Sequence, residues 1–117
     1  MMRRIAILAL LAAGVLRSIP AHAHAFLDSA NPRVGSTVAT APSQVTLRFT
    51  QRLEPKFSKA EVRNSAGARV DQGSTVSGSV IRLGVKTLSP GTYRVIWHVL
   101  SVDTHTTQGS FSFHVGR

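Results

Sequence analysis

Hydrophobic and polar residues alternate with a period of two in three stretches of the chain. Such alternation is typical of a strand with one face buried and one face in water. The apolar residues on the shared faces are Val45, Leu47 and Phe49; Tyr93, Val95, Trp97 and Val99; and Phe111, Phe113 and Val115. A fourth stretch, 80–85, is mostly apolar and β-branched. The pattern predicts strands at 45–50, 80–85, 93–100 and 111–115.

Weaker strand patterns and turn signals fill the chain between these segments. Further strands are expected near 25–29, 60–64 and 70–74, and 53–57 is expected to form one helical turn. Turn residues separate the segments at Asn31-Pro32, Ala41-Pro42, Ala66-Gly67 and Ser89-Pro90-Gly91. The sequence has no sustained helical period. Several short strands at this spacing predict an all-β fold, a two-sheet β-sandwich.

The first 23 residues have the pattern of a secretory signal peptide. Arg3 and Arg4 give a charged start, and the apolar run 5–16 follows. The run is shorter than the roughly 20 apolar residues that a helix needs to cross a bilayer. Ala21-His22-Ala23 supplies the small residues that signal peptidase accepts. We therefore expect a signal peptide at 1–23, secretion of the chain, and one mature domain over 24–117.

Composition narrows the chemistry open to the mature domain. Removing 23 of the 117 residues leaves 94, in which 11 Lys and Arg face 5 Asp and Glu, a formal charge of +6. The basic residues are scattered and aromatic residues are few, so nucleic-acid binding is not expected. The chain has no cysteine, and its two methionines are Met1 and Met2. Thiolate sites, cysteine nucleophiles and thioether-rich Cu(I) sites are thereby excluded.

The histidines are the remaining candidates for chemistry. His98 and His114 alternate with the apolar residues of their strands, so they are expected to face solvent as surface histidines. His105 lies between two strong strands, and loops held by a rigid sandwich often carry function. Asp103 is two residues before it, and in extended backbone that spacing points both side chains the same way. A carboxylate and an imidazole on one side form half of a metal site, although an Asp that caps a turn beside a His is the commoner cause of this pattern.

Cleavage before His24 would supply the other half of such a site. It frees an α-amine with a pKa of about 7.7–8.0. The amine and Nδ1 of the same residue can chelate one metal ion in a six-membered ring. With Asp103 and His105 they would offer three nitrogens and one oxygen, a tetragonal set that Cu(II) prefers, with Zn(II) as the main rival.

The cleavage position leaves other outcomes open. In one alternative, His24 is an incidental residue beside the cleavage site and binds no metal. Cleavage two residues earlier would leave His22-Ala23-His24, which could bind Cu(II) through its amine, backbone amides and imidazole without help from the fold. Cleavage after Ala25 would discard both histidines.

Catalytic alternatives have less support in the sequence. Asp103, His105 and a nearby Ser101 or Ser110 could be combined into a triad, but there is no nucleophile-elbow motif and nothing marks an activated serine. The sequence also lacks a paired-carboxylate signature and a glycine-rich phosphate loop. We therefore expect that the protein is not an enzyme.

The mature region resembles the CopC-type periplasmic copper-binding proteins, also called copper-resistance proteins. The matching residues are the Ala-His-Ala cleavage site with His24 behind it, Asn31-Pro32, Pro42, Val45-Thr-Leu-Arg-Phe49, Gly91-Thr-Tyr-Arg-Val95, Trp97, Ser101-Val-Asp-Thr-His105, Gly109 and Phe111-Ser-Phe113. Any one piece is weak. The specific signal is an N-terminal histidine combined with a Tyr-x-Val-x-Trp strand that leads into Ser-x-Asp-x-His.

The resemblance implies an Ig-like or cupredoxin-like Greek-key β-sandwich, or small β-barrel, with one tight Cu(II) site per chain. The amine and imidazole of His24 and the imidazole of His105 would bind the copper. Asp103 would supply a carboxylate, as a ligand or in a weaker axial role. The family also suggests a monomer and, as partner, an inner-membrane copper transporter of the CopD type.

The sequence departs from some members of the family in two places. Some have a glutamate near the copper where this chain has Gln51. We do not count Gln51 as a ligand, although it is a candidate to form a hydrogen bond near the copper. Some carry a Met-rich Cu(I) segment, whereas the corresponding stretch 63–75 has neither methionine nor histidine. The single-site Cu(II) type is therefore expected.

The leading hypothesis from the sequence is a periplasmic Cu(II)-binding protein for copper buffering, resistance or delivery. One alternative is a copper-dependent oxidative enzyme that uses an N-terminal histidine chelate. Such enzymes are generally larger and expose flat aromatic surfaces, whereas this chain has one Trp and one Tyr. The other alternative is a metal-free interaction module, since β-sandwiches host many functions.

Overall fold

The structure is a computed structural model, and it describes residues 26–116. The described chain consists of strands joined by loops and one 3-10 turn. The elements are β1 (Leu27–Asn31), β2 (Thr37–Val38), β3 (Gln44–Phe49), η3 (Pro55–Phe57), β4 (Lys59–Arg63), β5 (Asp71–Ser77), β6 (Val80–Val85), β7 (Gly91–Leu100) and β8 (Thr106–Val115). Within this range no helix is long and apolar enough to cross a membrane.

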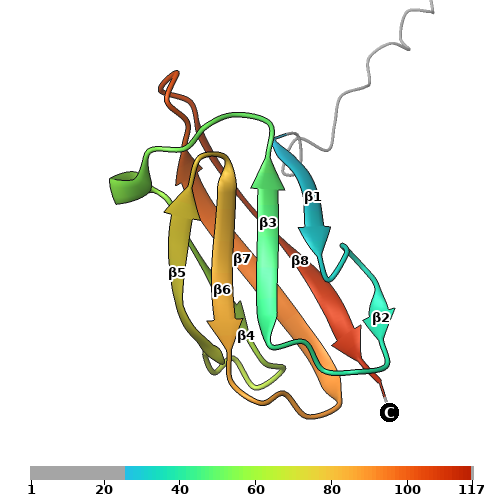
Figure 1. The fold of residues 1–117 in the computed structure, drawn as a ribbon. Helices are drawn as coiled ribbons and strands as arrows, with labels where there is room; N and C mark the ends of the chain where they lie inside the picture. The colour runs from blue at the N-terminus through green and yellow to red at the C-terminus, as the bar shows by residue number, and fades with distance from the viewer. Residues whose placement is uncertain (1–25, 117) are drawn as a thin grey trace, which may run out of the picture.

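The strands form two four-stranded sheets that pack face to face (Figure 1). One sheet has the order β1-β3-β6-β5, and the other has the order β2-β8-β7-β4. Neighbouring strands are antiparallel, except that the short β2 pairs with β8 in parallel. The predicted all-β, Ig-like Greek-key sandwich is confirmed.

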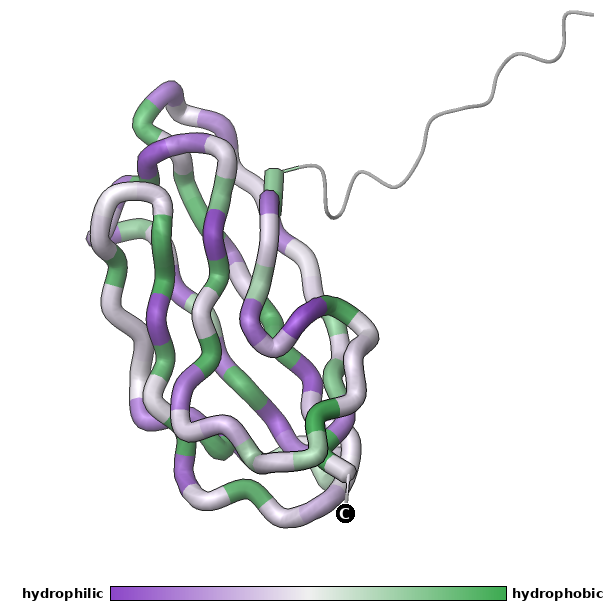
Figure 2. The backbone as a smooth tube through the Cα atoms, turned by 45° about the vertical axis from the view of Figure 1, so that its right-hand side comes forward, coloured by the Kyte–Doolittle hydropathy of each residue, from purple (hydrophilic) through white to green (hydrophobic). Residues whose placement is uncertain are grey.

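The period-two pattern of the sequence places alternate residues in the space between the sheets. On β3, Val45 and Leu47 are completely buried and lie opposite Leu83 and Ile81 of β6. The same alternation of apolar and polar residues is visible along the strands in Figure 2. A shift of one residue in register would turn this apolar set toward water, so the pattern fixes the strand pairing.

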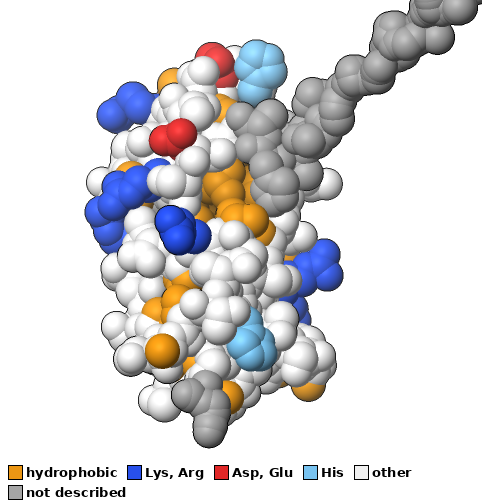
Figure 3. All heavy atoms as spheres, turned by 90° about the vertical axis from the view of Figure 1, so that its right-hand side faces the viewer, with side chains coloured by type: hydrophobic (Ala, Val, Ile, Leu, Met, Phe, Trp, Pro, Cys, Tyr) orange, Lys and Arg blue, Asp and Glu red, His pale blue; other side chains and the backbone are white. Residues whose placement is uncertain are grey.

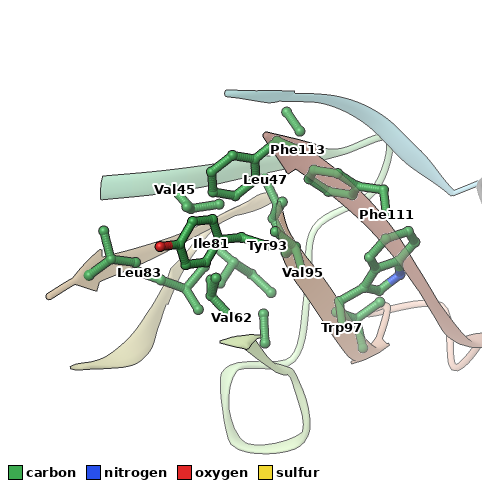
Figure 4. Close-up of a cluster of buried hydrophobic side chains, with 14 of the residues drawn as sticks. Val45, Leu47, Val62, Ile81, Leu83, Tyr93, Val95, Trp97, Phe111 and Phe113 are labelled. Carbon is green, nitrogen blue, oxygen red and sulfur yellow. The ribbon is translucent and has the colours of Figure 1, made fainter. Parts of the chain in front are cut away.

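Aromatic side chains fill the centre of the sandwich (Figure 4). Trp97 on β7 contacts Phe49 from the opposite sheet, edge to face, with ring centroids 6.1 Å apart. Tyr93 stacks on Phe113 at 5.6 Å, and its hydroxyl donates a hydrogen bond to the Ser89 carbonyl at 2.6 Å. The core therefore joins the sheets without a disulfide, since the chain has no cysteine.

Side-chain hydrogen bonds connect β4 and β5, which are edge strands of different sheets. The carboxylate of Asp71 accepts hydrogen bonds from the backbone amides of Val62, at 2.8 Å, and Gly73, at 3.0 Å. The Arg69 guanidinium forms an ion pair with the same carboxylate at 2.8 Å. Burial acts to raise the pKa of Asp71, but these hydrogen bonds and the Arg69 charge outweigh burial and hold the pKa below its usual range. Asp71 therefore accepts, as a carboxylate, hydrogen bonds from one backbone amide of each edge strand.

The strands agree with the sequence expectations except at two places. The three weaker patterns correspond to β1, β4 and β5, and the expected helical turn is η3. The two-residue β2 was not predicted, because it is too short to have a period. Strand β8 begins at Thr106 rather than at Phe111. Its first five residues are polar or glycine, and pairing with β7 makes them a strand.

Candidate metal site

A tight turn between β7 and β8 carries the Asp-x-His pair. The backbone amide of Ser101 donates to the carbonyl of His105 at 2.9 Å, and the amide of Thr104 donates to the carbonyl of Ser101 at 2.9 Å. Thr104 has a φ of 73°. A β-branched residue rarely adopts this left-handed conformation. The backbone of the turn is therefore held in a specific conformation at the position between Asp103 and His105.

The turn brings the two predicted side chains together. Nδ1 of His105 lies 3.2 Å from Oδ1 of Asp103, and the side chains are 81% and 45% exposed. Figure 3 shows histidine and acidic side chains side by side at the end of the molecule where this turn lies. The two side chains are together as expected, but the expected reason is wrong, because the backbone between them is a tight turn with Thr104 in the left-handed region and is not extended. Their role as metal ligands stays a prediction.

The hydroxyl of Ser101 lies under the pair and contacts both residues. Ser101 is completely buried. Its Oγ donates a short hydrogen bond to Oδ1 of Asp103 and accepts one from the backbone amide of His105 at 3.2 Å. The Ser101 hydroxyl, followed by His105, holds the pKa of Asp103 below its usual range. The carboxylate is therefore ionised at neutral pH and available to a cation.

The beginning of the described chain lies at the same end of the sandwich. The ring of Phe26 packs on Phe49 with centroids 5.7 Å apart, and the carbonyl of Phe26 accepts a hydrogen bond from the amide of Thr50 at 3.1 Å. The segment that follows Thr50 runs beside the Asp-x-His turn, since the amide of Val102 donates to the carbonyl of Arg52 at 2.9 Å. Three segments far apart in sequence thus meet at this end (Figure 1).

The third proposed ligand, His24, lies outside the described residues, as do the signal peptide and its cleavage site. Among residues 26–116 no group of three or more His, Asp or Glu side chains could hold a metal ion. Within this range Asp103 and His105 are two neighbouring side chains that could each donate to a metal ion. A complete site needs a donor from elsewhere.

The other histidines lie on the outer face of their sheet, as the sequence predicted. His98 is exposed on β7, opposite Lys59 of β4 and Gln108 of β8. His114 is exposed on β8, with Nδ1 3.1 Å from the hydroxyl of Thr92. Neither approaches the Asp-x-His turn through any of these contacts.

The sequence analysis missed the role of Ser101 beneath the ligand pair. It considered Ser101 only as a nucleophile, but a hydroxyl that donates to the carboxylate of Asp103 and accepts from a backbone amide serves a different purpose. The sequence feature that could have indicated this role is a small hydroxyl residue two positions before Asp103 and four before His105. Gln51, the residue in the place of a family glutamate, is exposed.

Comparison with known proteins identifies the family. A model of the CopC domain matches residues 27–116. The chain belongs to the CopC family. It is 36% identical to copper resistance protein C of Xanthomonas campestris pv. juglandis over 123 residues, which cover 97% of this chain and 96% of that protein. The crystal structure of CopC from Methylosinus trichosporium OB3b superposes with a TM-score of 0.73 at 33% identity, over 78% of this chain and 92% of that one.

One CopC relative is much longer than this chain. The copper transport protein CutJ of Bacillus subtilis is 31% identical over 100 residues, which are 81% of this chain but 18% of CutJ. A CopC-like segment is therefore a small part of a larger protein in that case.

Membership of the CopC family decides the class of function. The chain is a copper-binding protein of a copper-resistance family and not an enzyme. The aromatic residues agree with this conclusion. Trp97 and Tyr93 are 1% and 4% exposed, so neither can form the flat aromatic surface expected of a polysaccharide-oxidising copper enzyme.

Proposed function

We propose that the protein binds one Cu(II) ion per chain in the periplasm, after cleavage before His24. The α-amine and imidazole of His24, the imidazole of His105 and the carboxylate of Asp103 bind the ion. The observation that carries the proposal is that the Phe26 segment and the turn of the Asp103–His105 pair are both hydrogen-bonded to the segment 50–52 at one end of the sandwich.

Covalent geometry supports the participation of His24. The carbonyl of Phe26 accepts a hydrogen bond from the amide of Thr50. The carbonyl of Arg52, two residues later, accepts one from the amide of Val102 in the Asp-x-His turn. Each residue of an extended chain spans about 3.3–3.6 Å, so residue 24 starts no more than about 7 Å from residue 26. We propose that these two residues carry His24 from the Phe26 anchor to the turn without a rearrangement of the sandwich.

The donor set favours Cu(II) over the other common divalent ions. Two imidazoles, one amine and one carboxylate suit a tetragonal N,O geometry, and Cu(II) stands at the top of the affinity series for such ligands. The α-amine is the donor that must lose a proton near neutral pH. The carboxylate of Asp103 is held ionised by Ser101, and an α-amine loses its proton near pH 8.

A protein with an exposed site can exchange its ion with a partner. The His105 side chain is 81% exposed, so a bound ion is accessible from the end of the molecule. The CopC-like segment of CutJ is part of a protein named for copper transport. We propose that the protein acts as a monomer that buffers copper or delivers it, with an inner-membrane transporter of the CopD type as the partner.

Isothermal titration of correctly processed protein tests the site. The protein that begins at His24 is expected to bind one Cu(II) per chain. His24→Ala together with His105→Ala should abolish stoichiometric binding, because one imidazole from each half of the site is lost. Retention of one tightly bound Cu(II) by the double variant would overturn the proposal.

A further inference from the structure

We propose that Ser101 is a positioning residue for the copper site. Its hydroxyl fixes the carboxylate of Asp103 and the backbone of His105 relative to each other. The inference rests on the proposed function of Asp103 and His105 as copper ligands. It adds a residue that binds no metal but determines the geometry of the two that do.

The hydrogen-bonding capacity of a serine matches the arrangement. A hydroxyl has one donor hydrogen and two acceptor lone pairs. Ser101 uses the hydrogen for Oδ1 of Asp103 and a lone pair for the backbone amide of His105 at 3.2 Å. One atom is therefore bonded to both residues, and an alanine at this position would leave the carboxylate and the amide without these bonds.

Burial makes Ser101 a rigid support for exposed groups. Ser101 is 0% exposed, and its backbone pairs with buried Leu53 in an isolated antiparallel bridge. The side chains of His105 and Asp103 are 81% and 45% exposed, so packing restricts their rotamers less than it would in the core. Ligands of this kind depend on hydrogen bonds from surrounding residues for their orientation.

The contacts also distinguish the donor atoms. Oδ1 of Asp103 accepts the hydrogen bond from Ser101 and lies 3.2 Å from Nδ1 of His105. With Oδ1 engaged by the Ser101 hydroxyl, Oδ2 of Asp103 is the carboxylate oxygen left for the ion. Ser101 therefore favours a carboxylate that binds through one oxygen.

Ser101→Ala in the processed protein tests the inference, with Ser58→Ala as the matched control. Ser58 is also a buried serine, 7% exposed, and its hydroxyl bonds the backbone of Leu100 at 3.1 and 3.3 Å. It contacts neither Asp103 nor His105 through these bonds. Both variants remove one buried hydroxyl near the same turn, and only Ser101→Ala removes a contact to the ligand pair.

Copper titration and electron paramagnetic resonance give the readouts. We expect Ser101→Ala to weaken Cu(II) binding about 10–100-fold, the range for residues that support metal ligands, and to change the parallel copper hyperfine splitting. Ser58→Ala should keep both the affinity and the spectrum, whatever its loss of thermal stability. Ser101→Thr, which keeps a hydroxyl, should retain the wild-type spectrum. An unchanged spectrum and affinity in Ser101→Ala, or equal losses in Ser58→Ala, would overturn the inference.

A measurement without copper separates this inference from the proposed function. Backbone ¹⁵N relaxation should show increased motion at Asp103 and His105 in metal-free Ser101→Ala but not in Ser58→Ala. If the wild-type protein bound no copper, the proposed function would fail. The relaxation comparison would still decide whether Ser101 orders the backbone at Asp103 and His105. Equal order of the turn in metal-free wild type and Ser101→Ala would count against the inference by itself.

Discussion

The backbone amide of Thr50 donates a hydrogen bond to the carbonyl oxygen of Phe26 across 3.1 Å. This bond attaches the first described residue to the end of β3, and the Phe26 ring packs on Phe49 below it. The segment after Thr50 is in turn bonded to the Asp-x-His turn. Under the proposed cleavage, His24 stands two residues before this anchor in the sequence.

Loss of the Phe26 anchor should weaken copper binding without unfolding the domain. In Phe26→Ala the ring contact with Phe49 disappears. The entropic cost of ordering the N-terminus must then be offset by copper binding itself, which lowers the affinity. We expect the Kd for Cu(II) to rise about tenfold, measured by competition with a chelator of known affinity. Val34→Ala, which truncates another apolar side chain that is 51% exposed, is the control and should bind copper as the wild type does.

Removal of His105 should have a larger effect than removal of any other described histidine. His105→Ala deletes a proposed ligand, whereas His114→Ala deletes an imidazole whose contact is the Thr92 hydroxyl. Copper titration should show a loss of at least about 100-fold in affinity for His105→Ala, since one of four donors is gone. His114→Ala should leave the affinity unchanged, and comparable losses in both variants would argue against the Asp-x-His turn as the site.

Replacement of Asp71 should destabilise the fold without affecting copper. Asp71→Asn removes a buried charge that bonds two backbone amides and Arg69. Leaving these partners without their charged acceptor should cost about 2–3 kcal/mol of unfolding free energy. Calorimetry should show a fall in Tm of roughly 10–20 °C for a domain of this size. Copper stoichiometry should stay at one per chain.

The stability difference at Asp71 should also depend on pH. The folded pKa of Asp71 lies below its usual value, which is about 3.9 in an unfolded chain. The carboxylate therefore contributes its full stabilisation above about pH 4 and loses it as the pH falls through the lower folded pKa. Urea unfolding should show a constant gap between wild type and Asp71→Asn near neutral pH, and a shrinking gap below about pH 4. A gap that widened in acid would contradict this account.

Truncation of a completely buried core residue should be costly. Leu47 is completely buried, between Ala30 of β1 and Ile81 of β6 in the sheet. Leu47→Ala should lower the free energy of unfolding by about 2–5 kcal/mol, because buried methyl groups are removed and a cavity is left. Urea unfolding followed by the fluorescence of Trp97, the single tryptophan, measures the loss. A loss below about 1 kcal/mol would mean that the site is less tightly packed than its burial indicates.

The sequence predicted the sandwich well because its strands are half buried. Alternation on β3, β7 and β8 determines which residues face the core, and the structure buries Val45, Trp97 and Phe113 accordingly. It also predicted that Asp103 and His105 lie on one side of the chain. It did not predict β2 or the first half of β8, because these segments become strands through pairing with neighbours and have no apolar period of their own.

The long-range contacts around the site could not be predicted from local pattern. Nothing in the sequence around Phe26 indicates that its carbonyl bonds Thr50, which is 24 residues away. The same holds for Asp71, whose role at the amide of Val62 depends on how two sheets approach each other. Ser101 is closer in sequence to its partners, but only the tight turn shows that its hydroxyl serves both of them.

The intact mass of the exported protein, measured under native conditions with and without Cu(II), tests the central claim most directly. The account predicts a chain that begins at His24 and gains one copper ion. The same chain with an added residue before His24 should lose this tight binding, because the α-amine moves away from the histidine. One tightly bound copper in a chain with a different N-terminus, or none in the chain that begins at His24, would contradict the account.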